Sequence, residues 1–164
     1  MRAEEILPAG SWDTTREVDR VLIDYDRRFR RRIVLTTVLG AEVLIDLPQA
    51  VRLQDGDGLG VESGVVRVCA QAEDLMEIRA TEKGGLVRIA WHLGNRHLPV
   101  QLLDDRIRIR SDHVIGAMVR GLGGQVDRIT AAFDPESGAY AGDGHHHDHH
   151  HDDLHNADDD DHHH

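Results

Sequence analysis

The stretch 106-RIRIRSDHVIGAMVRGLGG-124 changes its hydrophobic period halfway along. From Arg106 to Arg110 isoleucine and arginine alternate strictly, which predicts a strand with its isoleucines toward a core and its arginines toward water. Apolar residues then recur at helical spacing, and Ser111 is placed to cap that helix. The predicted helical stripe is Val114, Ile115, Met118 and Leu122, and the predicted terminating glycines are Gly121, Gly123 and Gly124.

The segments around this stretch extend it to an alternation of strands and helices. Gly94 is placed as a left-handed cap for the first helix, and Pro99 favours an edge position for the strand that follows. The predicted order β-α-β-β-α-β is that of a ferredoxin-like domain, over residues 71–135. Its other predicted elements are a strand at Leu75–Arg79, a helix at Leu86–Leu93, a strand at His97–Leu103 and a strand at Val126–Phe133.

Residues 1–70 show only the signals of short strands. Runs rich in β-branched residues recur about every ten residues, with Gly and Asp between them, which predicts a small all-β domain. Pro48 is expected to end the third run. The predicted strands are Val18–Tyr25, Arg31–Thr37, Ala41–Leu47, Leu59–Val61 and Val65–Cys69. The chain as a whole is thus predicted to be of the α+β class.

A cluster of arginines lies in this half of the chain, from just after the first predicted strand into the start of the second. Asp24 and Asp26 stand beside it, so a solvated hairpin is the favoured interpretation, and a docking patch for an acidic protein partner is the alternative. The cluster comprises Arg27, Arg28, Arg30, Arg31 and Arg32.

The end of the chain is rich in histidine and aspartate. Ten of the thirteen histidines lie in residues 143–164, where little apolar area is available to offset the entropy of ordering, so we expect residues 136–164 to be disordered. Neutral imidazole suits nickel, copper and zinc. Alternatives are an engineered tag, of which His162–His164 could be a remnant, and a solubilising acidic tail. The candidate metal ligands in this segment are His145, His146, His147, His149, His150, His151 and His155.

The negative charge is concentrated in the same segment. Residues 143–164 hold eight of the thirty acids and no Lys or Arg, so 22 acids face 19 basic residues in the rest, a net charge of −3 against −11 for the whole chain. A mildly acidic body argues against binding to nucleic acid or to an anionic membrane surface. No signal peptide or membrane-length apolar run is present, and the single Cys69, expected to be a buried small hydrophobe, forms no internal disulfide. A cytoplasmic location is expected.

Three histidines, His92, His97 and His113, lie outside that segment. His92 falls near the end of a predicted helix, where a structural role is favoured, and His113 is expected on the surface, where it is a candidate metal ligand beside His97. His97 follows a helix stop and is presented at a junction. One histidine makes a weak site, because nickel and zinc take four to six donors. A symmetric dimer would bring two copies of His97 to one ion, with histidines of the tail completing the shell.

The segment Trp91 to Gln101, with its tetrad Gly94-Asn95-Arg96-His97, resembles the UreE nickel metallochaperones that serve urease maturation. The Asp112-His113-Val114 segment, the Phe133–Tyr140 exit and the histidine-rich end follow in the family's order. The resemblance implies an N-terminal β domain that docks protein partners, a ferredoxin-like metal-binding domain, and a homodimer with Ni(II) between the two copies of His97. The implied partners are the urease apoprotein and its accessory proteins, including a GTPase. In the family, an additional pair of histidines can occupy the region of Ser111 and His113. In this chain the first position of that pair is Ser111, so only His113 is a histidine.

Signatures of an enzyme are weak in this sequence. Gly121–Gly124 lacks the Lys-Ser/Thr of a phosphate-binding loop, and His92 and His97 lie five apart across a helix end, which does not suit a zinc protease. We therefore expect no catalytic residue. The favoured function is a carrier of nickel as cargo, with copper and zinc able to bind in vitro. The alternative is a metal-storage protein without a delivery partner.

Overall fold

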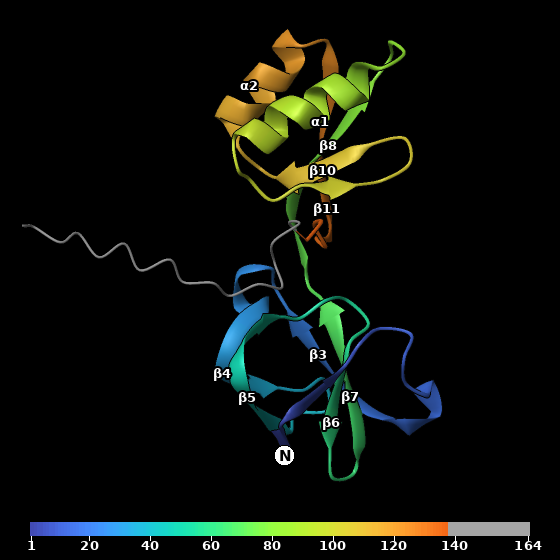
Figure 1. Cartoon of the computed structure of the whole chain (residues 1–164), viewed down its shortest axis with the longest axis vertical. Coiled ribbons are helices and arrows are strands. Elements are labelled where there is room, and N and C mark those ends of the chain that lie inside the picture. Colours follow the sequence, from blue (N-terminus) through green and yellow to red (C-terminus); the bar gives the residue numbers. More distant parts are fainter. Residues whose placement is uncertain (138–164) are drawn as a thin grey trace, which may run out of the picture.

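The computed structural model describes residues 1–137 of the 164-residue chain. A β region forms one end of the described structure, and a region with both helices forms the other (Figure 1). The N-terminal elements are β1 Arg2–Ala3, β2 Glu5–Leu7, η1 Thr14–Arg16, β3 Glu17–Ile23, η2 Asp26–Arg28, β4 Phe29–Thr36, β5 Glu42–Arg52, β6 Gly58–Val61 and β7 Gly64–Ala70. The C-terminal elements are β8 Ala72–Ala80, α1 Gly85–Asn95, β9 Gln101–Leu102, β10 Ile107–Arg110, α2 His113–Gly121 and β11 Gly124–Ala132.

The β region consists of two sheets over one core. Their strand orders are β1-β5-β4 and β2-β6-β7-β3. Alternation decides which side chains enter the core: in β3, Val21 and Ile23 are fully buried, and Leu22 between them is 56% exposed. Both sheets supply buried aliphatic side chains to one cluster, including Val21 of one and Ile45 of the other. The predicted all-β character of this half is confirmed.

Strand β5 does not end at Pro48, contrary to the sequence prediction. It continues to Arg52, because Pro48 falls where the ladder with β4 is irregular, with the register shifting between Arg30 and Arg32. A proline without an N–H is tolerated at such a place. The strand therefore keeps its pairing on both sides of the proline.

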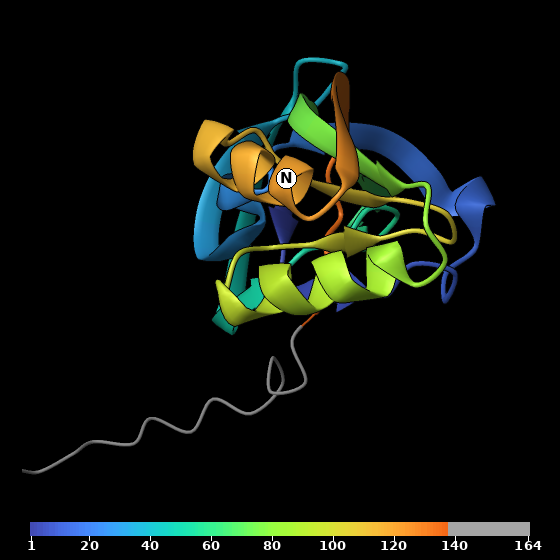
Figure 2. The same ribbon diagram turned by 90° about the horizontal axis from the view of Figure 1, so that it is seen from above.

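The C-terminal region has the predicted order β-α-β-β-α-β. Its four strands form an antiparallel sheet in the order β11-β8-β10-β9. Ile107 and Ile109 of β10 are buried, as the alternation predicts, and they join Ile89 and Leu93 of α1 and Val119 of α2 in one core. Figure 2 looks onto the two helices from their end of the molecule. The strand predicted at His97–Leu103 shrinks to β9, which does lie at the sheet edge.

Three predicted details of the helices are wrong. Gly94 is not a left-handed cap, because α1 runs through it to Asn95. The N-cap of α2 is Asp112 rather than Ser111, since its carboxylate accepts the backbone N–H groups of Val114 and Ile115 at 2.9 and 3.1 Å. Val114 is 55% exposed and so does not belong to the predicted stripe of α2, whereas the other three members, Ile115, Met118 and Leu122, do pack on the core.

A buried arginine joins the two regions. Arg28, expected in a solvated hairpin, is 1% exposed, and its guanidinium donates to the carbonyl of Phe133 and to Asp134, the latter at 3.2 Å. Tyr25 packs on Phe133 with ring centroids 5.4 Å apart. Arg110 of β10 pairs with Asp26 at 2.9 Å. Arg28 therefore connects the two regions instead of facing water.

In the part of the chain that the structure describes, no helix is long and apolar enough to cross a membrane. The histidine-rich stretch predicted to be disordered lies, from residue 138 on, outside the described residues. Before it, the N–H of Glu136 donates to Val100 at 2.8 Å.

Candidate metal centre

The end of α1 sets the position of His97. The N–H groups of Arg96 and His97 donate to Leu93 and Gly94, each at 3.1 Å, and so close a turn directly after the helix. His97 is the only non-glycine residue of the first 137 with a positive φ, 55°. A left-handed residue other than glycine costs about 1–2 kcal/mol and is often found at functional sites. The turn leaves the His97 imidazole exposed.

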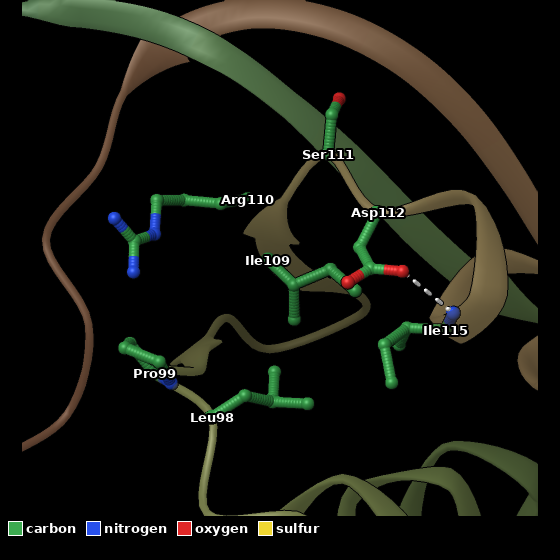
Figure 3. A pocket seen from close by; sticks show the side chains of 7 residues that line it. All are labelled: Leu98, Pro99, Ile109, Arg110, Ser111, Asp112 and Ile115. Atoms are coloured by element: carbon green, nitrogen blue, oxygen red, sulfur yellow. Dashed lines mark hydrogen bonds between the residues drawn. The ribbon is translucent and has the colours of Figure 1, made fainter.

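A hollow of about 340 Å³ lies beside this turn (Figure 3). Leu98 and Pro99, which follow His97, line one side, and Asp112, which precedes His113, lines the other. The chain neighbours of both predicted ligands therefore face one hollow. The remaining lining residues are Ile109, Arg110, Ser111 and Ile115.

The other two body histidines take the places predicted for them. His113 is exposed and begins α2, while His92 is half-buried in the last turn of α1 and meets Trp91 edge to face, with ring centroids 5.0 Å apart. His113 can accept a metal from solvent. The contact of His92 is with Trp91, its neighbour on the same helix.

Among residues 1–137, no three His, Cys, Asp or Glu side chains converge in a way that could hold a metal ion. A single exposed imidazole fills one of the four to six positions that nickel or zinc takes. A complete shell at His97 therefore needs ligands from a second copy of the chain or from residues beyond 137. The predicted ligands His145, His146, His147, His149, His150, His151 and His155 lie outside the described residues.

Other titratable groups in the described part of the chain serve structure. Cys69 is half-buried, and burial raises the pKa of its thiol, which keeps it protonated and a poor ligand. Burial would raise the pKa of Glu77, but hydrogen bonds from Arg108 and Arg79, at 3.1 and 3.0 Å, hold that pKa below its usual value. Glu77 thus stays ionised among arginines on the sheet.

An exposed apolar pair lies on the same helix that ends at His97. Val87 and Trp91, one helical turn apart on α1, are 74% and 64% exposed. They fall outside the stripe of α1 that faces the core, which is Leu86, Ile89, Ala90 and Leu93. Together they form a small apolar patch on the outer face of the helix.

Two family models together match nearly the whole chain. The model for the N-terminal domain of the UreE urease accessory protein matches residues 3–71, and the model for its C-terminal domain matches residues 73–164. The chain belongs to the UreE family. Members of this family are accessory proteins of urease rather than urease itself.

UreE proteins of several bacteria are similar over most of the chain. The urease accessory protein UreE of Bradyrhizobium sp. (strain ORS 278) is 51% identical over 146 residues, which are 88% of this chain and 69% of the relative. The one from strain BTAi1 is likewise 51% identical, over 88% of this chain and 70% of the relative. The UreE of Beijerinckia indica is 43% identical, over 88% of this chain and 83% of the relative. The resemblance carried by Gly94–His97 is thereby confirmed.

Two features of this UreE protein escaped sequence reasoning. Arg28 looked like its solvated neighbours, and nothing local marks it as the residue that enters the joint. The Val87–Trp91 pair had a visible signal, because Trp91 lies off the helical stripe. A large aromatic residue on the polar side of an amphipathic helix indicates a contact surface.

Proposed function

We propose that this protein is a cytoplasmic nickel metallochaperone that delivers Ni(II) to the urease apoprotein and its accessory proteins, which include a GTPase. The observation that supports this most is the position of His97, exposed on a left-handed turn directly after α1 in a chain of the UreE family. An exposed imidazole exchanges its ion readily. Protons compete for the same lone pair, so binding weakens as pH falls.

The proposed site is shared between two copies of the chain. Burying Val87 and Trp91 of α1 against a second copy would remove apolar surface from water and bring the two α1 ends toward each other. His97 lies two residues beyond Asn95, the last residue of α1, so its two copies would then meet on one ion. His113 and the tail histidines supply further ligands.

We further propose a division of labour along the chain. Residues 1–70 dock protein partners, residues 71–135 form a ferredoxin-like domain for metal binding and dimerisation, and residues 136–164 gather ions. The strand order β11-β8-β10-β9 supports the ferredoxin-like assignment. The segment's histidines give capacity for nickel, and also for copper or zinc in vitro.

Nickel titration of three proteins tests this division. We expect a chain ending after Ala141 to lose most of the bound nickel of the full chain while keeping one tight ion per dimer. His97→Ala in the full chain should lose that tight ion and keep most of the stoichiometry. If the shortened chain binds nothing, or His97→Ala binds as before, the proposed site is wrong.

Light scattering tests the proposed interface separately. Trp91→Glu should convert the dimer to a monomer, because a buried unpaired carboxylate opposes the contact. Leu39→Glu is the matched control, since Leu39 is 78% exposed on the β4–β5 turn of the other region. A dimer that survives Trp91→Glu would place the interface elsewhere.

A storage or buffering role is the second candidate, and the ten histidines of residues 143–164 favour it. The two roles differ in whether the protein passes its nickel to urease apoprotein. Nickel-loaded protein mixed with urease apoprotein and its accessory proteins should raise urease activity more than the same amount of free nickel in the presence of a weak chelator. No advantage over free nickel would favour storage.

A further inference from the structure

Strand β4 carries an uncompensated group of arginines. Arg30, Arg31 and Arg32 on β4 and Arg27 just before it are all exposed, and we call these four the arginine strip. Within residues 1–137, no carboxylate pairs with any of the four side chains, and Arg30 donates only to the carbonyl of Phe29.

The backbone explains why consecutive arginines all face water. An ordinary strand would turn every second side chain inward, but the register between β4 and β5 shifts between Arg30 and Arg32. In addition, β4 is one of the two edge strands of its sheet. Three charges thus accumulate along one exposed edge.

The carboxylates near the strip already pair with other arginines or accept a backbone N–H. Asp26 pairs with Arg110 and Asp46, across from Arg32, pairs with Arg2, each at 2.9 Å. Asp24 accepts the N–H of Arg27 at 2.8 Å. The positive charge of the strip is therefore left for a ligand with several carboxylates.

The chain itself holds such a ligand close by. Residues 143–161 contain eight aspartates and no Lys or Arg. The described chain ends beside the strip: the Gln54 side chain donates to the Ser137 hydroxyl at 3.4 Å, and Gln54 lies two residues past Arg52, which pairs with Phe29 at the start of β4.

The length of the chain is sufficient for contact. The six residues from 138 to 143 can span up to roughly 20 Å, and the eight residues of β4 extend over about 27 Å. The aspartates from Asp143 to Asp161 can therefore reach every arginine of the strip.

We propose that, without metal, residues 143–161 dock on the arginine strip of the same protein, and that metal ions bound by their histidines release them. Each bound divalent ion cancels the charge of two carboxylates and so weakens the attraction to arginine. The release step rests on the proposed metal binding by this segment, whereas the docking step does not.

Paramagnetic relaxation in the full chain tests the docking. A spin label is attached at Asn156→Cys in a Cys69→Ala background, and amide intensities of β4 are compared with those of α1. In chelator at about 20 mM salt, β4 should lose more than about half of its intensity while α1 keeps its own, and about 0.5 M salt should abolish the effect by screening. Equal broadening of β4 and α1, or none on β4, would overturn docking.

Charge-matched variants and zinc complete the design. The triple variant Arg30→Gln, Arg31→Gln, Arg32→Gln should restore the β4 intensities, whereas the control Arg16→Gln, Arg88→Gln, Arg120→Gln, on exposed residues of other elements, should not. If both variants act alike, net charge and not the strip is responsible. Zinc, which is diamagnetic, should restore β4 as the triple variant does, and persistent broadening with zinc would overturn release. Docking is measured without metal, so its failure leaves the nickel titrations unaffected.

Discussion

His97 combines two properties that a single substitution removes together. Its imidazole is the proposed ligand, and its backbone has a φ of 55°, which glycine adopts without strain. The sequence pointed to His97 through the tetrad Gly94–His97. Its left-handed conformation, however, was expected at Gly94.

Comparing His97→Gly with His97→Ala separates the two properties. Both variants should lose the tight nickel ion. His97→Gly should be more stable than His97→Ala by about 1 kcal/mol in urea unfolding without metal, because only alanine carries a Cβ in the left-handed region. Equal stabilities would mean that the turn relaxes when histidine is removed.

Glu77 contributes to the loss of stability at low pH. Its folded pKa lies below the unfolded value, so its stabilising effect is fully present above the unfolded pKa and is lost as pH falls through the folded one. Below about pH 4.5 the unfolding free energy should therefore fall less steeply in Glu77→Gln than in the parent protein. Urea unfolding at a series of pH values measures this. Glu82→Gln, on an exposed turn, should follow the parent curve.

At the scale of elements, the positions of the strands and helices were largely predictable. Strong periodicity marks β10 and both helices, because burial on one face imposes it. The ends were less predictable: α1 passes through Gly94, and β5 passes through Pro48. Glycine and proline often end an element, but neither does so at these two positions. The surrounding structure decided that each element continues.

Gly94→Ala tests the observed end of α1. Gly94 is helical, and a Cβ there would have no neighbour within 4 Å among the described residues, so alanine should stabilise the protein by about 0.5–1 kcal/mol through its higher helix propensity. Thermal or urea unfolding checks the sign. Nickel binding should be kept. A loss of stability would instead support the cap that the sequence suggested.

At the scale of the whole molecule, Arg28 holds the two regions together. Arg28→Ala removes a buried guanidinium and leaves the Phe133 carbonyl and Asp134 without their partner, so we expect a loss of about 2–4 kcal/mol in unfolding free energy. The exposed neighbour Arg27→Ala should cost less than about 0.5 kcal/mol. Urea unfolding followed by fluorescence and by circular dichroism compares the two variants. If Arg28→Ala is no worse than Arg27→Ala, the joint does not depend on this contact.

The sequence by itself determined the fold class, the order of the elements and the histidine of greatest interest, because local periodicity and the Gly94–His97 tetrad are written in consecutive residues. Only the tertiary structure decided that Arg28 is buried while Arg30, Arg31 and Arg32 all face water. These outcomes depend on which distant residues meet: Arg28 reaches Phe133 across 105 positions of the chain, and a shift of register in the β4–β5 ladder turns the other arginines outward. Contacts between residues far apart in the chain cannot be read from a local sequence pattern.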